Sequence, residues 1–292
     1  MKNKILLVDG NLLLFKSFFA TQHSSNPLKT SKGIDTSAVN TFILSLIKVV
    51  ATYNPTHCFI AFDAGKKTKR HDVYDEYKAG RAKAPIEIFE QKKVIVKILD
   101  AMNITHMDME GYEGDDLIAS MTTKFSDDNI ILVWSDDQDL LQLIDNNVGV
   151  IVKDFKTKQF IVKDIHNFKD NHGFEHYQIP DFKGISGDSS DNLPGVKGIG
   201  PKGAIDLLNR YQTLENIYNN LDQLTMNQKN KFLESKDIAF MCKELAKLEL
   251  FLDIKIELKD LVLNDLLNDQ VDNILNEYEL MTIKKVLSKK IL

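Results

Sequence analysis

Short apolar runs alternate with helical patterns through the first half of the chain. Three runs are compact and rich in branched or aromatic residues, as buried strands are: Ile5–Val8, Cys58–Phe62 and Ile130–Trp134. Between them, apolar residues recur at spacings of three and four, which predicts helices over Thr36–Tyr53, Pro85–Met102 and Glu113–Phe125. This alternation predicts an α/β fold with a central, mostly parallel sheet and flanking helices.

The pattern changes near the middle of the chain. Two short apolar runs separated by polar residues predict a hairpin or edge ribbon over Val148–Asp154 and Gln159–Asp164. From about Ile165 the chain is mainly helical, and its remaining strand candidate is Phe251–Ile256. Two long amphipathic stretches follow the helical period, Met226–Leu248 and Leu261–Leu292. We therefore expect an α/β core over residues 1–164 and a helical region over residues 165–292.

Composition narrows the class of protein. The 292 residues are 43% hydrophobic, enough for a substantial core, and 37 Lys+Arg against 42 Asp+Glu give a net charge of −5. Taken alone, this charge argues against a nucleic-acid partner. The two cysteines, Cys58 and Cys242, have no partner at motif spacing, so we expect buried, reduced thiols. With no secretory or membrane-spanning apolar segment in the sequence, a soluble cytoplasmic protein is expected.

Acidic residues follow the predicted strands at their carboxyl ends. Asp9 follows the first strand, Asp63 the second, and Asp137 and Asp139 the third. Another three acidic residues open a helix in GYEGDD: Glu113, Asp115 and Asp116. Any single one of them could simply cap a helix or form a turn. Together they converge on the rim where parallel sheets bind ligands. Because clustered carboxylates need cations to stay ionised, the set predicts an Mg²⁺ or Mn²⁺ site.

A glycine-rich segment, GVKGIGPKG, lies at Gly195–Gly203. It matches a dinucleotide fingerprint only formally, because no strand precedes it, and Pro201 occupies the position where a phosphate-binding P-loop needs lysine. A hairpin between two helices fits better, with the second helix over Pro201–Tyr211. Its exposed backbone N–H groups could hold a phosphate without base preference, and Lys197 and Lys202 favour that reading. An ordinary glycine-rich turn is the alternative.

Just upstream, the chain reads GDSSDN. Asp188 and Asp191 are spaced i, i+3, so on a helix they would share one face. They could complete the metal cluster from the helical region.

A basic segment directly follows Asp63. Lys66–Lys83 holds seven Lys and Arg against three acids, with Tyr74 and Tyr77 interleaved. Charges for phosphates together with aromatic faces for bases are typical of a channel for single-stranded nucleic acid. The alternatives are a solvated helix, or tyrosines packed in the core.

Five ordered motifs now carry a resemblance to a known family. They are LLVDGN, FDAG followed by RHDVYDEYKAGRAK, GYEGDD, DDQDL, and GISGDSSDNLPGVKGIGPKGA. Together they resemble the 5′-nuclease domain of bacterial DNA polymerase I and related flap endonucleases, densely from Met1 to about Tyr211. No polymerase follows within the 292 residues, so the chain looks like a freestanding member. The resemblance implies a PIN-like nuclease core and a helix–hairpin–helix (H3TH) motif at about 184–211.

The resemblance also implies roles for individual residues. The first metal site would use Asp9, Asp63, Glu113 and Asp115, with Asp116 adjacent, and the second Asp137, Asp139, Asp188 and Asp191. Basic residues near the scissile phosphate would be Lys78 and Arg81, with Tyr77 beside them. A helical arch at about 66–84 would carry Lys67, Lys69 and Arg70. The hairpin would grip duplex DNA through Lys197, Gly198, Gly200 and Lys202, and the carbonyls of Val196 and Ile199 would bind K⁺. Two departures from the family pattern are an extra carboxylate at Asp136, which we do not assign as a ligand, and Lys16 in place of arginine.

The sequence thus predicts a structure-specific 5′-nuclease. It would act as a 5′→3′ exonuclease and flap endonuclease, with two Mg²⁺ ions that Mn²⁺ can replace, in Okazaki primer removal and DNA repair. We expect a monomer that binds DNA with 5′ flaps, nicks or branched junctions and has no membrane partner. Two alternatives stay open: a non-catalytic binder of branched DNA, and a single-strand ribonuclease with a related core. The net charge of −5 does not exclude DNA, because bound divalent ions would offset the clustered acids.

Overall fold

A six-stranded sheet forms the centre of the molecule. The computed structural model describes residues 2–22, 25–65, 67–154 and 156–289. Along the sheet the strands follow the order β3-β2-β1-β4-β5-β6. Their bounds are Lys4–Asp9 (β1), His57–Ala61 (β2), Thr105–Met107 (β3), Ile130–Trp134 (β4), Val148–Lys153 (β5) and Phe160–Lys163 (β6). All neighbours pair in parallel except β5 and β6, which are antiparallel.

The predicted strands form the middle of this sheet. The three buried apolar runs are β2, β1 and β4, and the predicted hairpin is β5–β6. The sequence pattern missed β3, which has only three residues, all of them half-buried. In the register of the central strands, Asp9 lies opposite Ala61, and Val8 lies opposite both Ile60 and Trp134. These three strands therefore end nearly level, and the residues after them meet at one rim.

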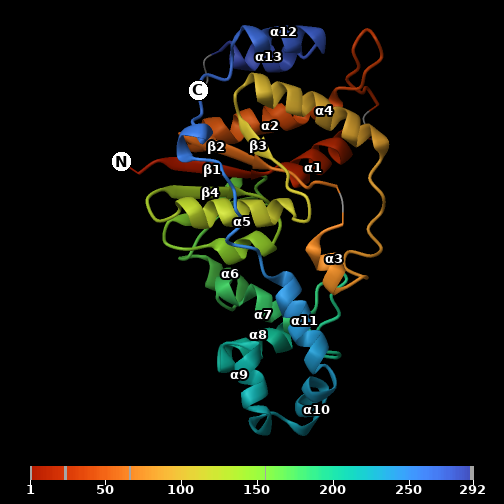
Figure 1. Cartoon of the computed structure of the whole chain (residues 1–292), viewed down its shortest axis with the longest axis vertical. Helices are drawn as coiled ribbons and strands as arrows, with labels where there is room; N and C mark the ends of the chain where they lie inside the picture. The colour runs from red at the N-terminus through yellow and green to blue at the C-terminus, as the bar shows by residue number, and fades with distance from the viewer. Residues whose placement is uncertain (1, 23–24, 66, 155, 290–292) are drawn as a thin grey trace.

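Helices cover both faces of the sheet (Figure 1). On one face lie α1 (Gly10–Gln22), α2 (Ser37–Tyr53) and α4 (Ile86–Ala101), and on the other α5 (Gly114–Phe125). Alternate residues of β1 supply the two cores: Leu6 and Val8 pack on the α2 side, and Ile5 and Leu7 on the α5 side. The α/β fold expected from the sequence is thus confirmed.

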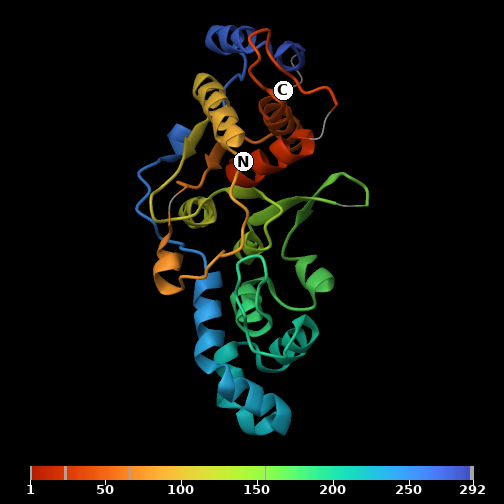
Figure 2. The ribbon, with the colours of Figure 1, turned by 90° about the vertical axis from the view of Figure 1, so that its right-hand side faces the viewer.

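A separate group of helices extends from the α/β core as a second lobe (Figures 1 and 2). It contains α6 (Phe168–His172), α7 (Ile179–Ser186), α8 (Pro201–Tyr211), α9 (Leu214–Asn219), α10 (Met226–Glu234) and α11 (Lys236–Ala246). Except for α6, whose buried Phe168 packs in the α/β core, these helices form their own apolar cluster, which includes Ile185, Leu207 and Phe232. The helix predicted over Pro201–Tyr211 is α8, and α7 with α8 forms the helix–hairpin–helix. The long stretch predicted at Met226–Leu248 is divided at Ser235 into α10 and α11.

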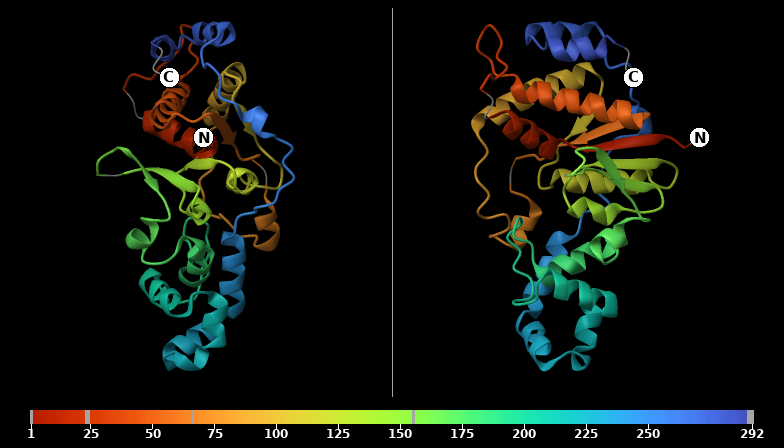
Figure 3. Two further views of the ribbon diagram at one scale, coloured as in Figure 1. Left: turned by 90° about the vertical axis from the view of Figure 1, so that its left-hand side faces the viewer. Right: turned by 180° about the vertical axis from the view of Figure 1, so that it is seen from behind.

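The last two helices return to the α/β core (Figure 3). These are α12 (Asp269–Glu277) and α13 (Met281–Leu287), and residues such as Leu275 and Ile283 join the cluster of α2 and α4. The helices of residues 165–292 therefore lie in two places, and the boundary at 164 stays a prediction. The amphipathic stretch Leu261–Leu292 contains two short helices, because the chain turns at Tyr278–Leu280 between them.

The expectation of a strand at Phe251–Ile256 is wrong. This segment runs beside α5 without a strand partner, and side chains of that helix take up its backbone polar groups. Ser120 Oγ accepts from Leu252 N at 3.1 Å, and Lys124 Nζ donates to the carbonyl of Ile256 at 2.8 Å. Short connections complete the chain: α3 (Lys69–Val73) and the 3-10 turns Asp139–Leu143, His176–Gln178, Leu221–Gln223 and Leu258–Leu261.

Two expectations concern the whole chain. Cys58 and Cys242 are both buried and free, as their spacing indicated. Among the described helices, none combines the length and the apolar character that crossing a bilayer requires.

Candidate active site

A cleft of about 280 Å³ opens at the rim where β1, β2 and β4 end. Its walls come from the strand ends, the first turns of α1 and α5, and the basic segment after β2. The residues that line it are Asp9, Asn11, Leu12, Phe15, Asp63, Lys78, Arg81, Glu113, Asp115 and Asp137. Five of the predicted metal-binding carboxylates thus share one cleft.

Asp9 is the carboxylate at the end of β1, and its side chain is buried. Its two oxygens accept from Leu12 N at 2.9 Å and from Ser135 Oγ at 2.8 Å. Burial raises the pKa of Asp9 to about 7, and the neighbouring charges of Asp63 and Asp137 add to the effect, although both hydrogen bonds oppose it. A cation bound nearby would favour the ionised form of this carboxyl.

Asp63 and Asp115 extend the same arrangement. Asp63 accepts from Gly114 N at 2.7 Å and from the side-chain amide of Asn11. Burial raises the pKa of Asp115 well above its ordinary value, followed by the repulsion of Asp137 and Asp9. These carboxylates repel one another across the cleft. A hard divalent cation bound between them would remove the repulsion.

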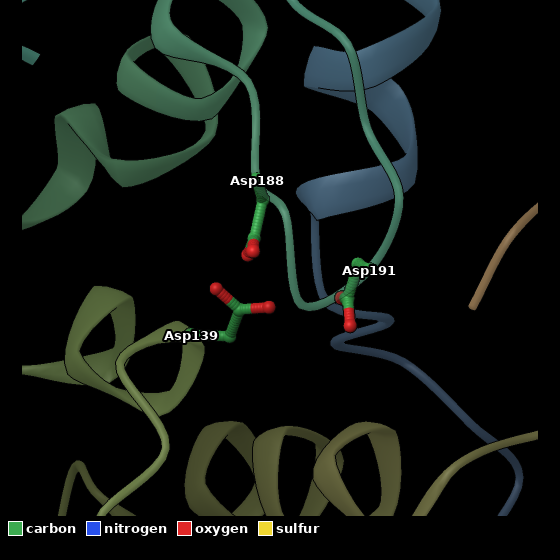
Figure 4. Close-up of side chains that lie close together, drawn as sticks. All are labelled: Asp139, Asp188 and Asp191. Carbon is green, nitrogen blue, oxygen red and sulfur yellow. The ribbon is translucent and has the colours of Figure 1, made fainter. Parts of the chain in front are cut away.

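A second acidic cluster lies beside the first. One carboxylate oxygen from each of Asp139, Asp188 and Asp191 lies within 4.8 Å of the others (Figure 4). Asp137 lies between the clusters, with its Oδ1 accepting from Asp139 N at 2.8 Å. The structure therefore brings together the carboxylates of the α/β core and those of the helical lobe.

Asp188 and Asp191 do not lie on a helix, so helical spacing is not what brings them together. They sit in a tight loop in which the backbones of Asp188 and Leu193 exchange hydrogen bonds of 2.8 and 2.7 Å. Two glycines close this loop: Gly195 has φ +64°, and a Cβ there would lie 2.2 Å from Gly187 N. Only glycine permits both that conformation and that approach.

Charges differ within the second cluster. Burial raises the pKa of Asp139 to about 7 against the pull of Lys183, whereas Asp188 has its pKa lowered to about 2 because Lys183 outweighs burial. Lys183 Nζ contacts both carboxylates, at 2.5 Å from Asp188 Oδ2. Asp191 is paired instead with Arg81, whose Nη2 donates to Oδ1 at 2.7 Å.

Lys78, Arg81 and Tyr77 connect the two clusters. Lys78 Nζ lies 2.8 Å from the carboxylate of Glu113, while the Tyr77 hydroxyl lies 3.3 Å from both Glu113 Oε2 and Asp191 Oδ2. Burial opposes the charge of Lys78, but Glu113 and Asp191 raise its pKa overall. The two predicted basic residues thus lie at the cleft, each on a carboxylate.

Tyr77 is packed rather than presented to a ligand. Tyr77 is only 3% exposed, and Tyr74 packs against it together with Leu193, Cys242 and Leu245. The expectation that Tyr77 contacts a DNA base does not fit this buried position, whereas Tyr74 is only partly buried. The core alternative describes Tyr77 better.

Asp116 and Arg70 also differ from their predicted roles. Asp116, 1% exposed, accepts two hydrogen bonds from Arg70, at 2.8 and 2.7 Å, and one from Glu113 N at 3.1 Å. Arg70 reaches further, to the carbonyls of Leu245 and Lys247 at 2.9 and 2.8 Å. Asp116 therefore points away from the metal cleft, and Arg70 joins α3 to α5 and α11 instead of facing DNA.

Other predicted DNA contacts are exposed. Lys67 is free of the core, Lys69 lies over the Tyr112 ring at 4.3 Å from its centroid, and Lys197 and Lys202 project from the hairpin. The first residue of the basic segment, Lys66, lies outside the described residues. Among the described residues of the predicted arch, 67–84, the helical part is Lys69–Val73.

At the hairpin, Gly198 has φ +81° and its carbonyl accepts from Lys231 Nζ at 3.0 Å. The carbonyl of Val196 accepts from Ile199 N at 3.0 Å. Gly200 precedes α8 in an extended conformation with Pro201 in the first turn, as the sequence indicated.

Sequence reasoning missed the residues that hold the carboxylates. Asn11, Ser135 and Lys183 bond to Asp63, Asp9 and the Asp139–Asp188 pair, respectively. Asn11 and Ser135 stand within two positions of a motif carboxylate, which is a usable signal, whereas nothing in the sequence singles out Lys183. The extra carboxylate, Asp136, turns away to pair with Lys16 and the backbone of Lys153, as its exclusion from the ligand set requires.

Two family models match the chain in succession. The first, described as the N-terminal resolvase-like domain of 5′-3′ exonuclease, matches residues 4–176. The second, the C-terminal SAM fold of 5′-3′ exonuclease, matches residues 174–269.

Individual proteins agree with these matches. The 5′-3′ exonuclease of Mycoplasmopsis pulmonis is 38% identical over 289 residues, which cover 98% of this chain and 94% of that protein. DNA polymerase I of Bacillus subtilis is 38% identical over 274 residues, 92% of this chain, but the chain spans only 30% of that longer protein. The structure of the bacteriophage T5 D15 flap endonuclease with DNA and metal ions has the same fold, with a TM-score of 0.66 at 19% identity over 99% of this chain and 97% of that one.

Proposed function

This chain belongs to the 5′-3′ exonuclease family of structure-specific 5′ nucleases, and we propose that it hydrolyses DNA phosphodiesters at 5′ flaps, nicks and branched junctions. The observation that carries the proposal is the meeting of carboxylates from three strand ends, a helix start and the Gly187–Gly195 loop in and beside one cleft. Removal of Okazaki primers and of repair flaps is the corresponding cellular role. Activity as a monomer is part of the proposal.

The donor set fits hard divalent cations, Mg²⁺ or Mn²⁺. All candidate ligands are carboxylate oxygens, and burial with mutual repulsion raises the pKa of three of them. Asp116 is left out because Arg70 engages it. The first ion would be held by Asp9, Asp63, Glu113 and Asp115, and the second by Asp137, Asp139, Asp188 and Asp191. Bound ions would supply Lewis acidity for an in-line displacement at phosphorus that leaves a 5′-phosphate and a 3′-hydroxyl.

The protein's own cations have a separate task. Lys78 and Arg81 line the cleft, each on a carboxylate that a divalent ion would neutralise. Both ammonium and guanidinium groups are then available to the scissile phosphate, where they stabilise the charge that develops on its oxygens. Tyr77 keeps Glu113 and Asp191 at a fixed separation from these two cations.

DNA would be held at two places outside the cleft. The hairpin between α7 and α8 presents exposed Lys197 and Lys202, and the first turn of α8 supplies backbone N–H groups that have no helical acceptor, for the phosphates of a duplex. The carbonyls of Val196 and Ile199 would bind K⁺ there. Lys67, just before α3, and Lys69, the first residue of α3, would line the path of the single strand. Specificity then comes from the distance between duplex grip and cleft, not from base reading.

Cleavage of end-labelled flap, nicked and single-stranded DNA, with and without Mg²⁺, tests the proposal. We expect Mg²⁺-dependent release of 5′ fragments from flap and nicked substrates. Replacement of Asp137 by asparagine should lower the rate more than about a hundredfold while DNA binding persists, because a ligand is lost without a change of shape.

Asp136 provides the matched control. It precedes Asp137 but faces Lys16 outside the cleft, so Asp136→Asn should cleave at the wild-type rate. Equal cleavage without divalent ions would contradict the mechanism. Binding without cleavage in every variant would favour a non-catalytic branched-DNA binder, and cleavage of RNA that needs no duplex would favour a single-strand ribonuclease.

A further inference from the structure

Lys183 lies in an unusual position for a lysine. It belongs to α7 and is only 8% exposed, although lysine is almost never fully buried without a partner. Its ammonium contacts two carboxylates, Asp139 Oδ1 and Asp188 Oδ2, the latter at 2.5 Å. The charged end of the side chain therefore points into the second acidic cluster and not to solvent.

The two clusters are compensated differently. In the first, Lys78 and Arg70 reach only Glu113, and the described donors to Asp9 and Asp63 are neutral: two backbone N–H groups, the Ser135 hydroxyl and the Asn11 amide. In the second, an ammonium already lies between Asp139 and Asp188, at hydrogen-bonding distance. A cation that bridges these two carboxylates must share them with Lys183 or displace it.

We propose that Lys183 is a built-in counter-cation of the second carboxylate cluster, and that a divalent ion binds there in competition with it. This inference rests on the proposed metal sites. Lys183 keeps Asp139 and Asp188 side by side when no ion is bound, because it cancels their repulsion. The same charge weakens the binding of a divalent ion, so the second site has a lower affinity than the first. Lys183 is thus a positioning residue that sets the metal concentration at which the second site fills.

Titration with Mn²⁺ tests the competition directly. The electron paramagnetic resonance signal of free Mn²⁺ gives the number and affinity of sites in the wild type, Lys183→Met and Lys183→Arg. Methionine keeps the apolar stem but removes the charge, so the weaker site should tighten at least about tenfold, the order of effect that groups behind metal ligands have. Arginine keeps the charge and should keep the weak site.

Lys243 supplies a matched control on α11, the helix that packs against α7. Lys243 is as buried as Lys183, and its ammonium bridges Asp181 and Glu215, both at 2.6 Å. Neither of these two acidic residues lines the cleft. Lys243→Met removes a comparable ion-pair network and should leave Mn²⁺ affinity unchanged. Melting in EDTA provides the second measurement: Lys183→Met should melt below the wild type, and saturating Mn²⁺ should raise its melting temperature by more than it raises that of the wild type.

The outcomes separate this inference from the proposed function. If the wild type binds no Mn²⁺, or if Asp9→Asn removes no site, the metal sites themselves are wrong. If the wild type binds two ions but Lys183→Met gives the same isotherm, or binds the second ion more weakly, the competition is refuted while the nuclease proposal stands. A melting curve of Lys183→Met that keeps the wild-type response to Mn²⁺ would refute it as well.

Discussion

Replacing Arg70 by methionine tests whether this residue is structural or faces DNA. Its guanidinium makes two hydrogen bonds to Asp116, one each to the carbonyls of Leu245 and Lys247, and a longer one of 3.4 Å to Glu113 Oε2. Asp116 is 1% exposed, so Arg70→Met leaves a buried carboxylate without its partner. Breaking a buried pair in this way costs about 3–5 kcal/mol.

Unfolding in urea gives the measurement, with the fluorescence of Trp134, the single tryptophan of the chain, as the probe. A loss of that size should also lower the thermal midpoint by roughly 5–8 °C in a chain of 292 residues. Because Arg70 joins α3 to α5 and α11, the loss should appear in the global transition. A double variant, Arg70→Met with Asp116→Leu, should recover part of the stability, since no charge is left buried.

Lys67→Met is the matched control for the alternative. Lys67 is exposed, so its removal should leave stability within about 0.5 kcal/mol. If Lys67 contacts a phosphate, Lys67→Met should lower the number of counterions released on DNA binding by about one, as measured from the dependence of the binding constant on salt concentration. The structural reading of Arg70 is refuted if Arg70→Met unfolds like the wild type and instead weakens DNA binding as Lys67→Met does.

Three further predictions concern other parts of the molecule. The pKa values of Asp9 and Asp139 are raised from 3.8 to about 7, so in EDTA their contribution to stability is fully present below pH 3.8 and is lost as pH rises through 7. Urea midpoints should therefore be lower at pH 8 than at pH 5, and the difference should be smaller in Asp9→Asn. An Asp9→Asn variant that shows the same difference as the wild type would contradict this prediction. Gly195→Ala should lower the free energy of unfolding by at least about 2 kcal/mol and should abolish binding at the weaker Mn²⁺ site. Gly33→Ala, with φ +82° but open space around it, should lower the free energy of unfolding by only about 1 kcal/mol. Equal losses of the two variants in urea titrations would refute the role of close packing. Leu275→Ala in α12 should lower the free energy of unfolding by about 2–5 kcal/mol, because this side chain is fully buried on the α/β core; a loss below 1 kcal/mol in urea would show that the C-terminal helices are dispensable to that core.

The sequence predicted what depends on local pattern and on strand ends. Asp9, Asp63 and Asp137 follow strands whose apolar runs are unmistakable, and parallel pairing alone brings their positions to one rim. The sequence could not predict whether Asp115 or Asp116 of GYEGDD faces the cleft. The two residues are separated by about 100° of rotation around the helix, and the pairing of Asp116 with Arg70 is not visible in the sequence.

Contacts between distant segments were beyond the sequence pattern. Whether Tyr77 stacks on a base or packs in the core depends on Leu193, Cys242 and Leu245, which are far along the chain. On a helix, the spacing of Asp188 and Asp191 would place them on one face, but the close approach of two glycines builds a loop that brings the same residues together. The chemistry was predictable there although the local conformation was not.

The return of α12 and α13 to the α/β core has a consequence for biosynthesis. The apolar face of α2 and α4 is among the first surfaces to leave the ribosome, yet Leu275, Ile283 and Leu287, which pack on it, are among the last. At 5–20 residues per second, roughly 6 to 25 s separate the synthesis of β6 from that of α13. During this interval the nascent chain makes its whole helical lobe while the core face stays uncovered. Chaperone binding and aggregation would compete with folding in this interval, and the slow step in maturation would be the docking of the last two helices.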